Sequence, residues 1–216
     1  AHIFCLSEGM RGMYAKAGVP AERLHVIPNS IRTEKYRFET ECKFPDRSLY
    51  LAKIDFRKRQ HIFQDIESLY FAGGCFDERF NQENPRWLGE WRREKLYNEL
   101  TYYGNLVLLS DGEAHPAVCQ EAFSAGLGVV ISEYSTANLD LDLPFIDVIP
   151  ENKVEDLEYV TSIIDKNREY SVNNREEIRK YAIDRHGWKE VVSETYLPKV
   201  FEIAGHFKPF IWSHNV

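Results

Sequence analysis

A stretch of mixed charge follows the most apolar short segment of the chain, residues 106–109. This stretch, residues 110–122, contains two carboxylates eight positions apart, Glu113 and Glu121, with Pro116 between them. Proline suits the first turn of a helix, where its missing N–H costs nothing, and the free amides of a helix start attract anions. Carboxylates beside such a phosphate site are good acceptors for vicinal hydroxyls, as in ribose or another sugar. The amides concerned are those of His115, Ala117 and Val118.

Three other interpretations of this stretch stay open. Glu113 and Glu121 could be a loop acid and part of a solvated helix face. Asp111 and Glu113 could hold a magnesium ion, although such a site normally recruits more oxygen ligands. His115 could be a general base, whereas a single loop histidine more often packs or caps.

A second charged segment, Lys53–Arg59, has four basic residues in seven positions within a chain of negative net charge. It falls at the end of an expected strand, 48–54. The carboxyl ends of parallel strands share one edge of a sheet, so this segment would adjoin the loop of Glu113. Basic side chains neutralise a diphosphate; a solvated helix start is the alternative. The residues expected to act in this way are Lys53, Arg57 and Lys58.

A third candidate is the aromatic turn Trp87–Trp91, which includes Leu88 and Gly89. It could stack on a nucleobase, although two tryptophans in a loop more often pack. Three common motifs are absent from the sequence: G-x-G-x-x-G after a strand, G-x-x-x-x-G-K-[ST], and G-x-S-x-G. These absences argue against a dinucleotide fingerprint, a P-loop kinase and a nucleophile-elbow hydrolase.

Short apolar runs alternate with longer amphipathic segments, which is typical of βα units around a mostly parallel sheet. The expected strands are 2–7, 24–27, 48–54, 69–72, 106–109, 129–131 and 146–149. The expected helices are 8–17, 60–66, 92–101, 117–125, 154–167, 174–185 and 188–203. The predicted fold class is therefore α/β, with a doubly wound, Rossmann-like parallel sheet.

We divide the chain into four parts. Residues 1–31 look like the end of a preceding domain and a strand that crosses to the next one. Residues 32–47 are polar and turn-rich, which indicates a linker. Residues 48–203 make one doubly wound domain, and residues 204–216 form an apolar tail.

Composition narrows the function classes. The 216 residues are 44% hydrophobic and 28% charged, as in an ordinary globular protein. The net charge of −7 argues against broad binding to nucleic acid or anionic lipid. The four cysteines are far apart, so we expect reduced thiols and neither a zinc site nor a disulfide framework. With no apolar run of about 20 residues and no signal peptide, we expect a cytoplasmic location.

These motifs together resemble a known family. The Asp111–Val130 segment is similar to the motif of glutamate, seven residues, glutamate in retaining glycosyltransferases of family 4, the glycosyl transferases group 1. Ser7–Asn29 resembles the crossing between the two domains of this GT-B fold, and Lys53 with Arg57-Lys58 resembles the family's basic pair. The resemblance covers nearly the whole chain and implies the C-terminal, donor-binding half of such an enzyme.

The resemblance also implies roles for particular residues. Glu121 would hold the ribose hydroxyls of a nucleotide-diphosphate sugar, and Glu113 the hydroxyls of the donor sugar. Lys53 and Lys58 would neutralise the departing diphosphate, so that neither a metal nor another cofactor is needed. The amides of the 115–118 loop would touch the sugar and phosphates, and the turn after Leu88-Gly89 would lie near the base.

Several positions depart from the family pattern. Ala52 replaces the usual glycine before the first basic residue, and Ala114-His115-Pro116 replaces Gly-Phe-Gly between the glutamates. Most of an N-terminal, acceptor-binding domain is missing, so we expect donor binding without sugar transfer by this chain alone. A glycan or lipid-linked acceptor would bind through that domain, at the inner face of a membrane in some cases. The sequence leaves the sugar, the base and the oligomeric state open.

Other functions remain as alternatives. Within enzymes, these are a different GT-B protein such as a sugar-nucleotide 2-epimerase or a glycosyl phosphorylase, although no cofactor lysine for the latter can be located. Outside enzymes, the chain could be a non-catalytic nucleotide-sugar-binding or interaction module. Glu113→Ala and Glu121→Ala distinguish the two classes, since only a donor site requires both carboxylates.

Overall fold

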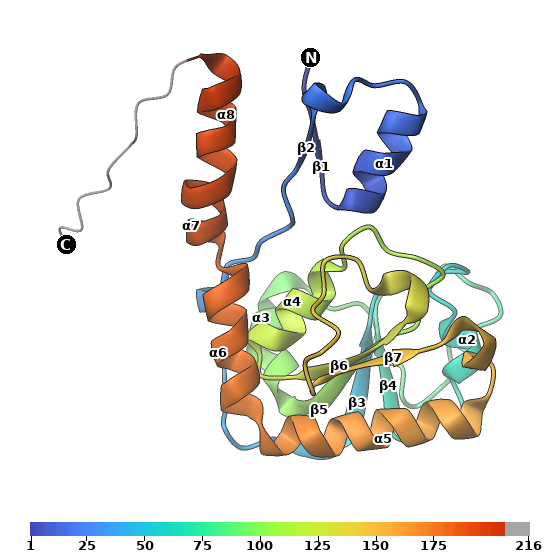
Figure 1. Ribbon diagram of the computed structural model, residues 1–216. Helices are drawn as coiled ribbons and strands as arrows, with labels where there is room; N and C mark the ends of the chain where they lie inside the picture. The colour runs from blue at the N-terminus through green and yellow to red at the C-terminus, as the bar shows by residue number, and fades with distance from the viewer. Residues whose placement is uncertain (206–216) are drawn as a thin grey trace.

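A computed structural model describes residues 1–205 and shows two units (Figure 1). The larger unit is built on a five-stranded sheet in which every neighbouring pair is parallel. The order of the strands is β4-β3-β5-β6-β7. Their bounds are Phe44–Leu51 (β3), Leu69–Ala72 (β4), Tyr103–Leu108 (β5), Gly128–Ser132 (β6) and Ile146–Ile149 (β7). The predicted α/β class with a Rossmann-like parallel sheet is confirmed.

The centre of this sheet explains why short apolar runs predicted it. Every residue of β5 and β6 is buried, as expected for parallel strands covered on both faces. The chain goes from β3 to β4 on one side, then crosses to β5 on the other side of β3. Such a reversal of strand order opens a crevice beyond the carboxyl ends of the two strands, here β3 and β5. Both charged segments follow these two strands.

The helices of the larger unit leave this crevice uncovered. Their bounds are Gln60–Phe63 (α2), Arg93–Glu99 (α3), Ala117–Ser124 (α4), Leu157–Asn173 (α5) and Arg175–His186 (α6). Helix α5 runs across the amino ends of the strands (Figure 1). There Asn167 donates hydrogen bonds to the carbonyls of Val129 and Phe145, and Arg168 donates one to Ser48. The loops at the opposite edge of the sheet, where the carboxyl ends of the strands lie, are therefore not covered by α5 and can contact a ligand.

The smaller unit consists of two parallel strands, β1 (Ile3–Cys5) and β2 (Leu24–Val26), joined through α1 (Glu8–Lys16). Ser7 caps α1 by accepting a hydrogen bond from the Met10 amide. The end of the described chain returns to this unit as α7 (Trp188–Val191), a π-helical segment (Val192–Tyr196) and α8 (Leu197–Ala204), as Figure 1 shows.

Two predicted boundaries differ from the structure. Residues 188–203 were assigned to the larger unit, but they lie beside the smaller one, where the rings of Phe4 and Tyr196 are 5.5 Å apart. The predicted linker, 32–47, contains the start of β3, because Phe44 pairs with Tyr103. The residues Pro45–Arg47 that follow Phe44 are largely exposed, so this part of β3 lacks the apolar run from which the other strands were predicted. Tyr36 also contacts the larger unit, where its hydroxyl donates to Glu121 of α4.

Of the predicted tail, 204–216, the residues from 206 onward lie outside the described part of the chain. Up to residue 205, the structure contains no helix with the length and apolar character needed to cross a bilayer.

Candidate functional site

A cavity of about 220 Å³ opens at the carboxyl ends of β3 and β5. Its lining comes from the ends of both strands, the basic segment after β3 and the loop that leads into α4. Six predicted site residues therefore meet in one place, as the shared edge of parallel strands requires. The lining residues are Leu51, Ala52, Lys53, Lys58, Leu108, Glu113, His115, Pro116, Ala117 and Val118.

An ion pair between Lys58 and Glu113 lies at the mouth of this cavity, with the two side chains 23% and 20% exposed. The loops that carry them are tied together by Tyr50, a fully buried residue of β3. The Tyr50 hydroxyl donates to the carbonyl of Lys58 and accepts from the amide of Leu109 at 2.9 Å. The cation and the carboxylate are thus held in place before any ligand arrives.

The remaining basic side chains of the segment have different partners. Arg59 pairs with Asp111 at 2.8 Å and with Glu151 at 2.6 Å, so its charge is compensated. Arg57 lies outside the cavity and donates to the Gly112 carbonyl. The Lys53 ammonium lies 4.3 Å from the centre of the Phe76 ring. Within residues 1–205, Lys53 and Arg57 have no carboxylate partner.

These pairs bear on the magnesium interpretation of the Glu113 loop. Asp111 is bound by Arg59 and Glu113 by Lys58. The two carboxylates therefore hold separate cations rather than one shared site.

The start of α4 offers unpaired donors to the cavity. Among the described residues, the amides of Ala117 and Val118 have no hydrogen-bond acceptor, whereas the Cys119 amide donates to the Pro116 carbonyl. Both free amides belong to residues that line the cavity, next to Lys58. Two donors at the positive end of a helix, beside an ammonium group, form a site suited to an anion.

Glu121 lies on α4 but does not line the cavity. One of its oxygens, Oε1, accepts a hydrogen bond of 2.8 Å from the hydroxyl of Tyr36. Burial raises the pKa of Glu121, against the hydrogen bond from Tyr36 and the charge of Arg93. Burial also raises the pKa of the Cys119 thiol, with contributions from both Glu113 and Glu121.

His115 connects the cavity to the crossing segment. The amide of Asn29 donates to its Nδ1 at 2.8 Å, and the Asn29 side chain donates to its carbonyl at 3.2 Å. Its Nε2 lies 2.8 Å from Nε2 of Gln120, which also donates to the Asn29 carbonyl. Because a backbone amide can only donate, Nδ1 of the ring is an acceptor. Burial also lowers the pKa of His115. The ring thus joins the two units and is not free to act as a general base.

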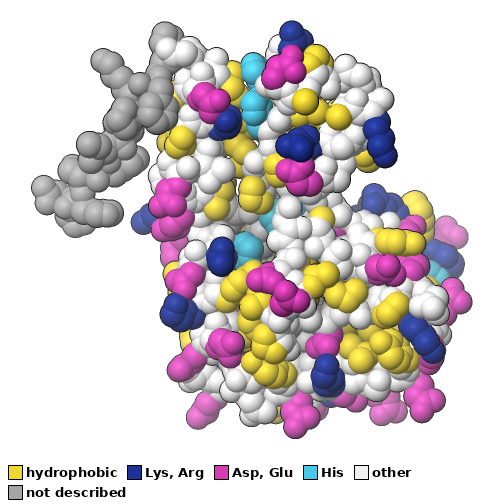
Figure 2. Space-filling model, in the orientation of Figure 1, with side chains coloured by type: hydrophobic (Ala, Val, Ile, Leu, Met, Phe, Trp, Pro, Cys, Tyr) yellow, Lys and Arg dark blue, Asp and Glu magenta, His cyan; other side chains and the backbone are white. Residues whose placement is uncertain are grey.

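Histidine side chains gather along the seam between the smaller unit and α7–α8 (Figure 2). Where the chain leaves α6 toward α7, the Ile31 amide donates to the carbonyl of His186, and the Trp188 amide donates to the carbonyl of Ile31. The two segments by which the chain passes between the larger and the smaller unit therefore lie side by side at Ile31 and Gly187. The His186 ring stacks on Phe123 with centres 6.1 Å apart, and its buried Nε2 has no hydrogen-bond partner among residues 1–205.

The buried ring of His186 predicts a loss of stability in acid. Burial, with smaller contributions from His115 and Arg185, lowers the pKa of His186 to about 4. In the unfolded chain, His186 has a pKa near its ordinary value of about 6.5. The stability that its neutral, buried ring contributes is therefore complete above about pH 6.5 and is lost as the pH falls toward 4. We expect the protonation of His186 to lower the free energy of unfolding by about 3 kcal/mol as the pH falls from 6.5 to 4.

The measurement is urea unfolding across that pH range for the wild type and His186→Phe. Phenylalanine keeps the stacking and loses no hydrogen bond, so the variant should have a much flatter pH dependence. Equal slopes for the two proteins would show that another group controls acid stability.

The aromatic turn packs against the protein rather than facing the cavity. The Trp87 indole donates to the Gly73 carbonyl, and its ring lies 6.4 Å from that of Phe80. The Leu88 amide donates to the Phe71 carbonyl, and the Gly73 amide donates to the Gly89 carbonyl. The turn therefore lies along the end of β4, at the carboxyl edge of the sheet, and neither Leu88 nor Gly89 lines the cavity.

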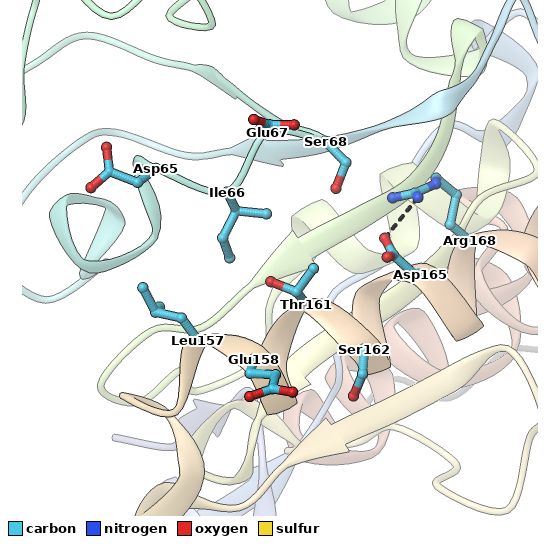
Figure 3. A pocket seen from close by; sticks show the side chains of 10 residues that line it. All are labelled: Asp65, Ile66, Glu67, Ser68, Leu157, Glu158, Thr161, Ser162, Asp165 and Arg168. Atoms are coloured by element: carbon cyan, nitrogen blue, oxygen red, sulfur yellow. Dashed lines mark hydrogen bonds and ion pairs between the residues drawn. The ribbon is translucent and has the colours of Figure 1, made fainter.

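A larger cavity of about 670 Å³ lies at the other end of the sheet (Figure 3). It lies between the first half of α5 and residues 65–68, which precede β4. Of the residues that the structure describes, four carboxylates and one cation line it, and this cation, Arg168, is paired with Asp165 at 2.7 Å. This charge repels phosphate, so the smaller cavity at the carboxyl edge is the better candidate for an anionic ligand.

Comparison with solved structures finds similar folds in several proteins. Alr3699/HepE of Anabaena, in complex with UDP-glucose, matches 95% of this chain with a TM-score of 0.71 at 15% identity. AviGT4, a glycosyltransferase involved in avilamycin A biosynthesis, matches 94% with a TM-score of 0.70 at 17% identity. The lipopolysaccharide outer core galactosyltransferase WaaB matches 94% with a TM-score of 0.67 at 16% identity.

The chain spans 64%, 64% and 62% of these three proteins, respectively. No protein-family model matches the sequence, and neither does any curated protein sequence. The structure and these likenesses together show that the chain has the Rossmann-like GT-B fold.

Proposed function

We propose that the chain is the donor-binding half of a retaining glycosyltransferase that uses a nucleotide-diphosphate sugar. The observation that carries the proposal is the cavity between β3 and β5, where Lys58, Glu113 and the free amides of α4 converge. Proteins of the same fold support it, since HepE was solved with UDP-glucose and with UDP. The glutamate spacing shared with family 4 enzymes supports retention of configuration.

The chemistry assigned to the site is the departure of a diphosphate. The bond between the anomeric carbon and the diphosphate oxygen breaks and its electron pair goes to the diphosphate. The oxygen of an acceptor hydroxyl forms the new bond to the anomeric carbon, and the proton of that hydroxyl passes to the departing diphosphate. The amides of Ala117 and Val118 and the ammonium groups of Lys53 and Lys58 stabilise the charge that develops. In this proposal the basic side chains supply the positive charge, and no metal is required.

The two glutamates recognise different parts of the donor. Glu113, inside the cavity, accepts hydrogen bonds from the sugar, and Glu121, on the far side of the α4 start, accepts them from ribose. The cavity is smaller than the roughly 300 to 1,000 Å³ of most small-molecule sites, so it holds only the diphosphate and sugar. The nucleoside then extends along α4 toward the ends of β4 and the Leu88-Gly89 turn.

The acceptor we propose is a glycan or a lipid-linked glycan, as in polysaccharide biosynthesis. It binds on the side of the smaller unit, which adjoins the cavity through Asn29 and His115. We place the reaction in the cytoplasm, at the inner face of a membrane when the acceptor is a lipid. The four free cysteines support a reducing compartment.

A thermal-shift titration tests donor binding. We expect one of UDP, GDP, ADP or dTDP, or one of their common sugars, to raise the melting temperature by several degrees. A ligand at about 100 times its dissociation constant adds about 2.7 kcal/mol, which is enough for such a shift in a chain of this size. An excess of EDTA should leave the shift unchanged.

Two variants make this test specific. Glu121→Ala should reduce the shift strongly while leaving residual binding through the diphosphate, whereas Glu158→Ala, an exposed glutamate at the opposite cavity, should keep the full shift. NAD and S-adenosylmethionine serve as negative controls. The proposal fails if no nucleotide stabilises the protein, or if the two variants behave alike.

A further inference from the structure

Tyr36 contacts the glutamate that we assign to ribose, although it lies 85 positions earlier in the chain. Its side chain is only 5% exposed. Its hydroxyl donates to Oε1 of Glu121 at 2.8 Å. Its ring packs edge-on against Tyr97 of α3, with centres 4.9 Å apart. A buried aromatic ring held in this way fixes the position of the hydroxyl and thereby of one carboxylate oxygen.

The direction of this hydrogen bond is set by the surroundings. Burial and the adjacent Glu121 carboxylate raise the pKa of Tyr36 well above its ordinary value, so the phenol keeps its proton and donates. An ionised carboxylate has further lone pairs beyond the one that Tyr36 uses. Glu121 is partly exposed. The remaining acceptor capacity is therefore available to the hydroxyls of a ligand.

The charge state of Glu121 depends on few neighbours. Burial disfavours its ionised form, and the hydroxyl of Tyr36 and the guanidinium of Arg93 oppose this effect. Cys119, on the same helix as Glu121, adds no charge, because burial raises the pKa of its thiol and keeps it neutral. From α3, the second aromatic hydroxyl, that of Tyr97, contacts Arg93 at 3.5 Å. Tyr36 is the hydrogen-bond donor to Glu121 among residues 1–205.

We propose that Tyr36 is a positioning residue, which holds Glu121 ionised and oriented so that the carboxylate can accept the ribose hydroxyls of the nucleotide. This role rests on the proposed donor site and goes beyond it, since Tyr36 is not among the residues that line the cavity. A protonated glutamate would offer a donor and lose acceptor capacity. Nucleotide affinity therefore depends on Tyr36 through the state of Glu121.

The test is the affinity of Tyr36→Phe for the nucleoside diphosphate that stabilises the wild type, measured by calorimetry over a range of pH. We expect about tenfold weaker binding near neutral pH, the size of one lost hydrogen bond to a charged group. As the pH falls, the affinity of the variant should begin to drop at a higher pH than that of the wild type, because its Glu121 takes up a proton more readily. Affinity for inorganic pyrophosphate, which has no ribose, should not change.

Tyr97→Phe is the matched control, since it removes a hydroxyl from the same aromatic pair without touching Glu121. It should bind the nucleotide as the wild type does. In a Glu121→Ala background, adding Tyr36→Phe should have no further effect, because the residue acts only through Glu121. Equal behaviour of Tyr36→Phe and Tyr97→Phe, or additive effects in the double variant, would overturn the inference and leave the donor site standing. If Glu121→Ala binds normally, both the inference and the ribose assignment fail.

Discussion

Replacing Lys58 by glutamate is expected to weaken the binding of a nucleoside diphosphate by about a thousandfold, or about 4 kcal/mol. The substitution removes a charge-assisted hydrogen bond to the diphosphate, worth about 1.5 to 3 kcal/mol. It also places a second carboxylate against Glu113 in a cleft where both side chains are mostly shielded from water. The measurement is isothermal titration with the nucleotide that stabilises the wild type.

Lys180→Glu is the matched control for this variant. Lys180 also pairs with a carboxylate, Asp184, but it lies on α6 and is 77% exposed. Both substitutions make the net charge more negative by the same amount, so a long-range effect of charge would weaken binding equally. We expect Lys180→Glu to bind nearly as the wild type does. Similar losses in the two variants would remove Lys58 from the diphosphate site.

Gly73→Ala is expected to lower the free energy of unfolding by about 4 kcal/mol or more. Gly73 follows β4 with φ +152°, a backbone conformation that side chains rarely adopt. A Cβ there would lie 1.9 Å from the carbonyl oxygen of Ala52 and 3.2 Å from the amide nitrogen of Lys53. Both contacts are with backbone at the end of β3, so relief requires a shift of the strand that carries Lys53 into the cavity.

Gly89→Ala separates this overlap from the cost of a positive φ alone. Gly89 lies beside Gly73 with φ +70°, and a Cβ there meets no atom within 4 Å. Its substitution should cost about 1 to 2 kcal/mol. Urea unfolding compares the two variants. A cost for Gly73→Ala no greater than that for Gly89→Ala would contradict the close approach of β4 to β3.

Much of the fold could be predicted because its sheet is buried and parallel. The strands at 69–72 and 146–149 have the predicted bounds, since each is a short apolar run between turn residues. Helix α4 agrees with the prediction to within one residue, because Pro116 precedes its start and Gly126 follows its end. β3 begins earlier than predicted, because cross-strand contacts of Phe44 outweigh the polar character of the residues after it.

The candidate site was predictable only in part, for a related reason. Lys58 and Glu113 follow neighbouring parallel strands, so topology alone brings them to one edge. The partner of Glu121, Tyr36, comes from the predicted linker, and that of His115, Asn29, from the crossing segment, 85 and 86 positions away, respectively. No periodicity fixes the path of such a segment. The signal for Tyr36 was a large aromatic residue in a mostly polar stretch, which a linker would not bury.

The most direct test of the donor site is an NMR titration of the isotope-labelled chain with the stabilising nucleoside diphosphate. Our account predicts that the largest changes in amide resonances fall on Ala117 and Val118 at the start of α4 and on the loop of Lys58. Changes centred instead on residues 65–68 and the first half of α5 would place the ligand in the opposite cavity and contradict the proposed donor site.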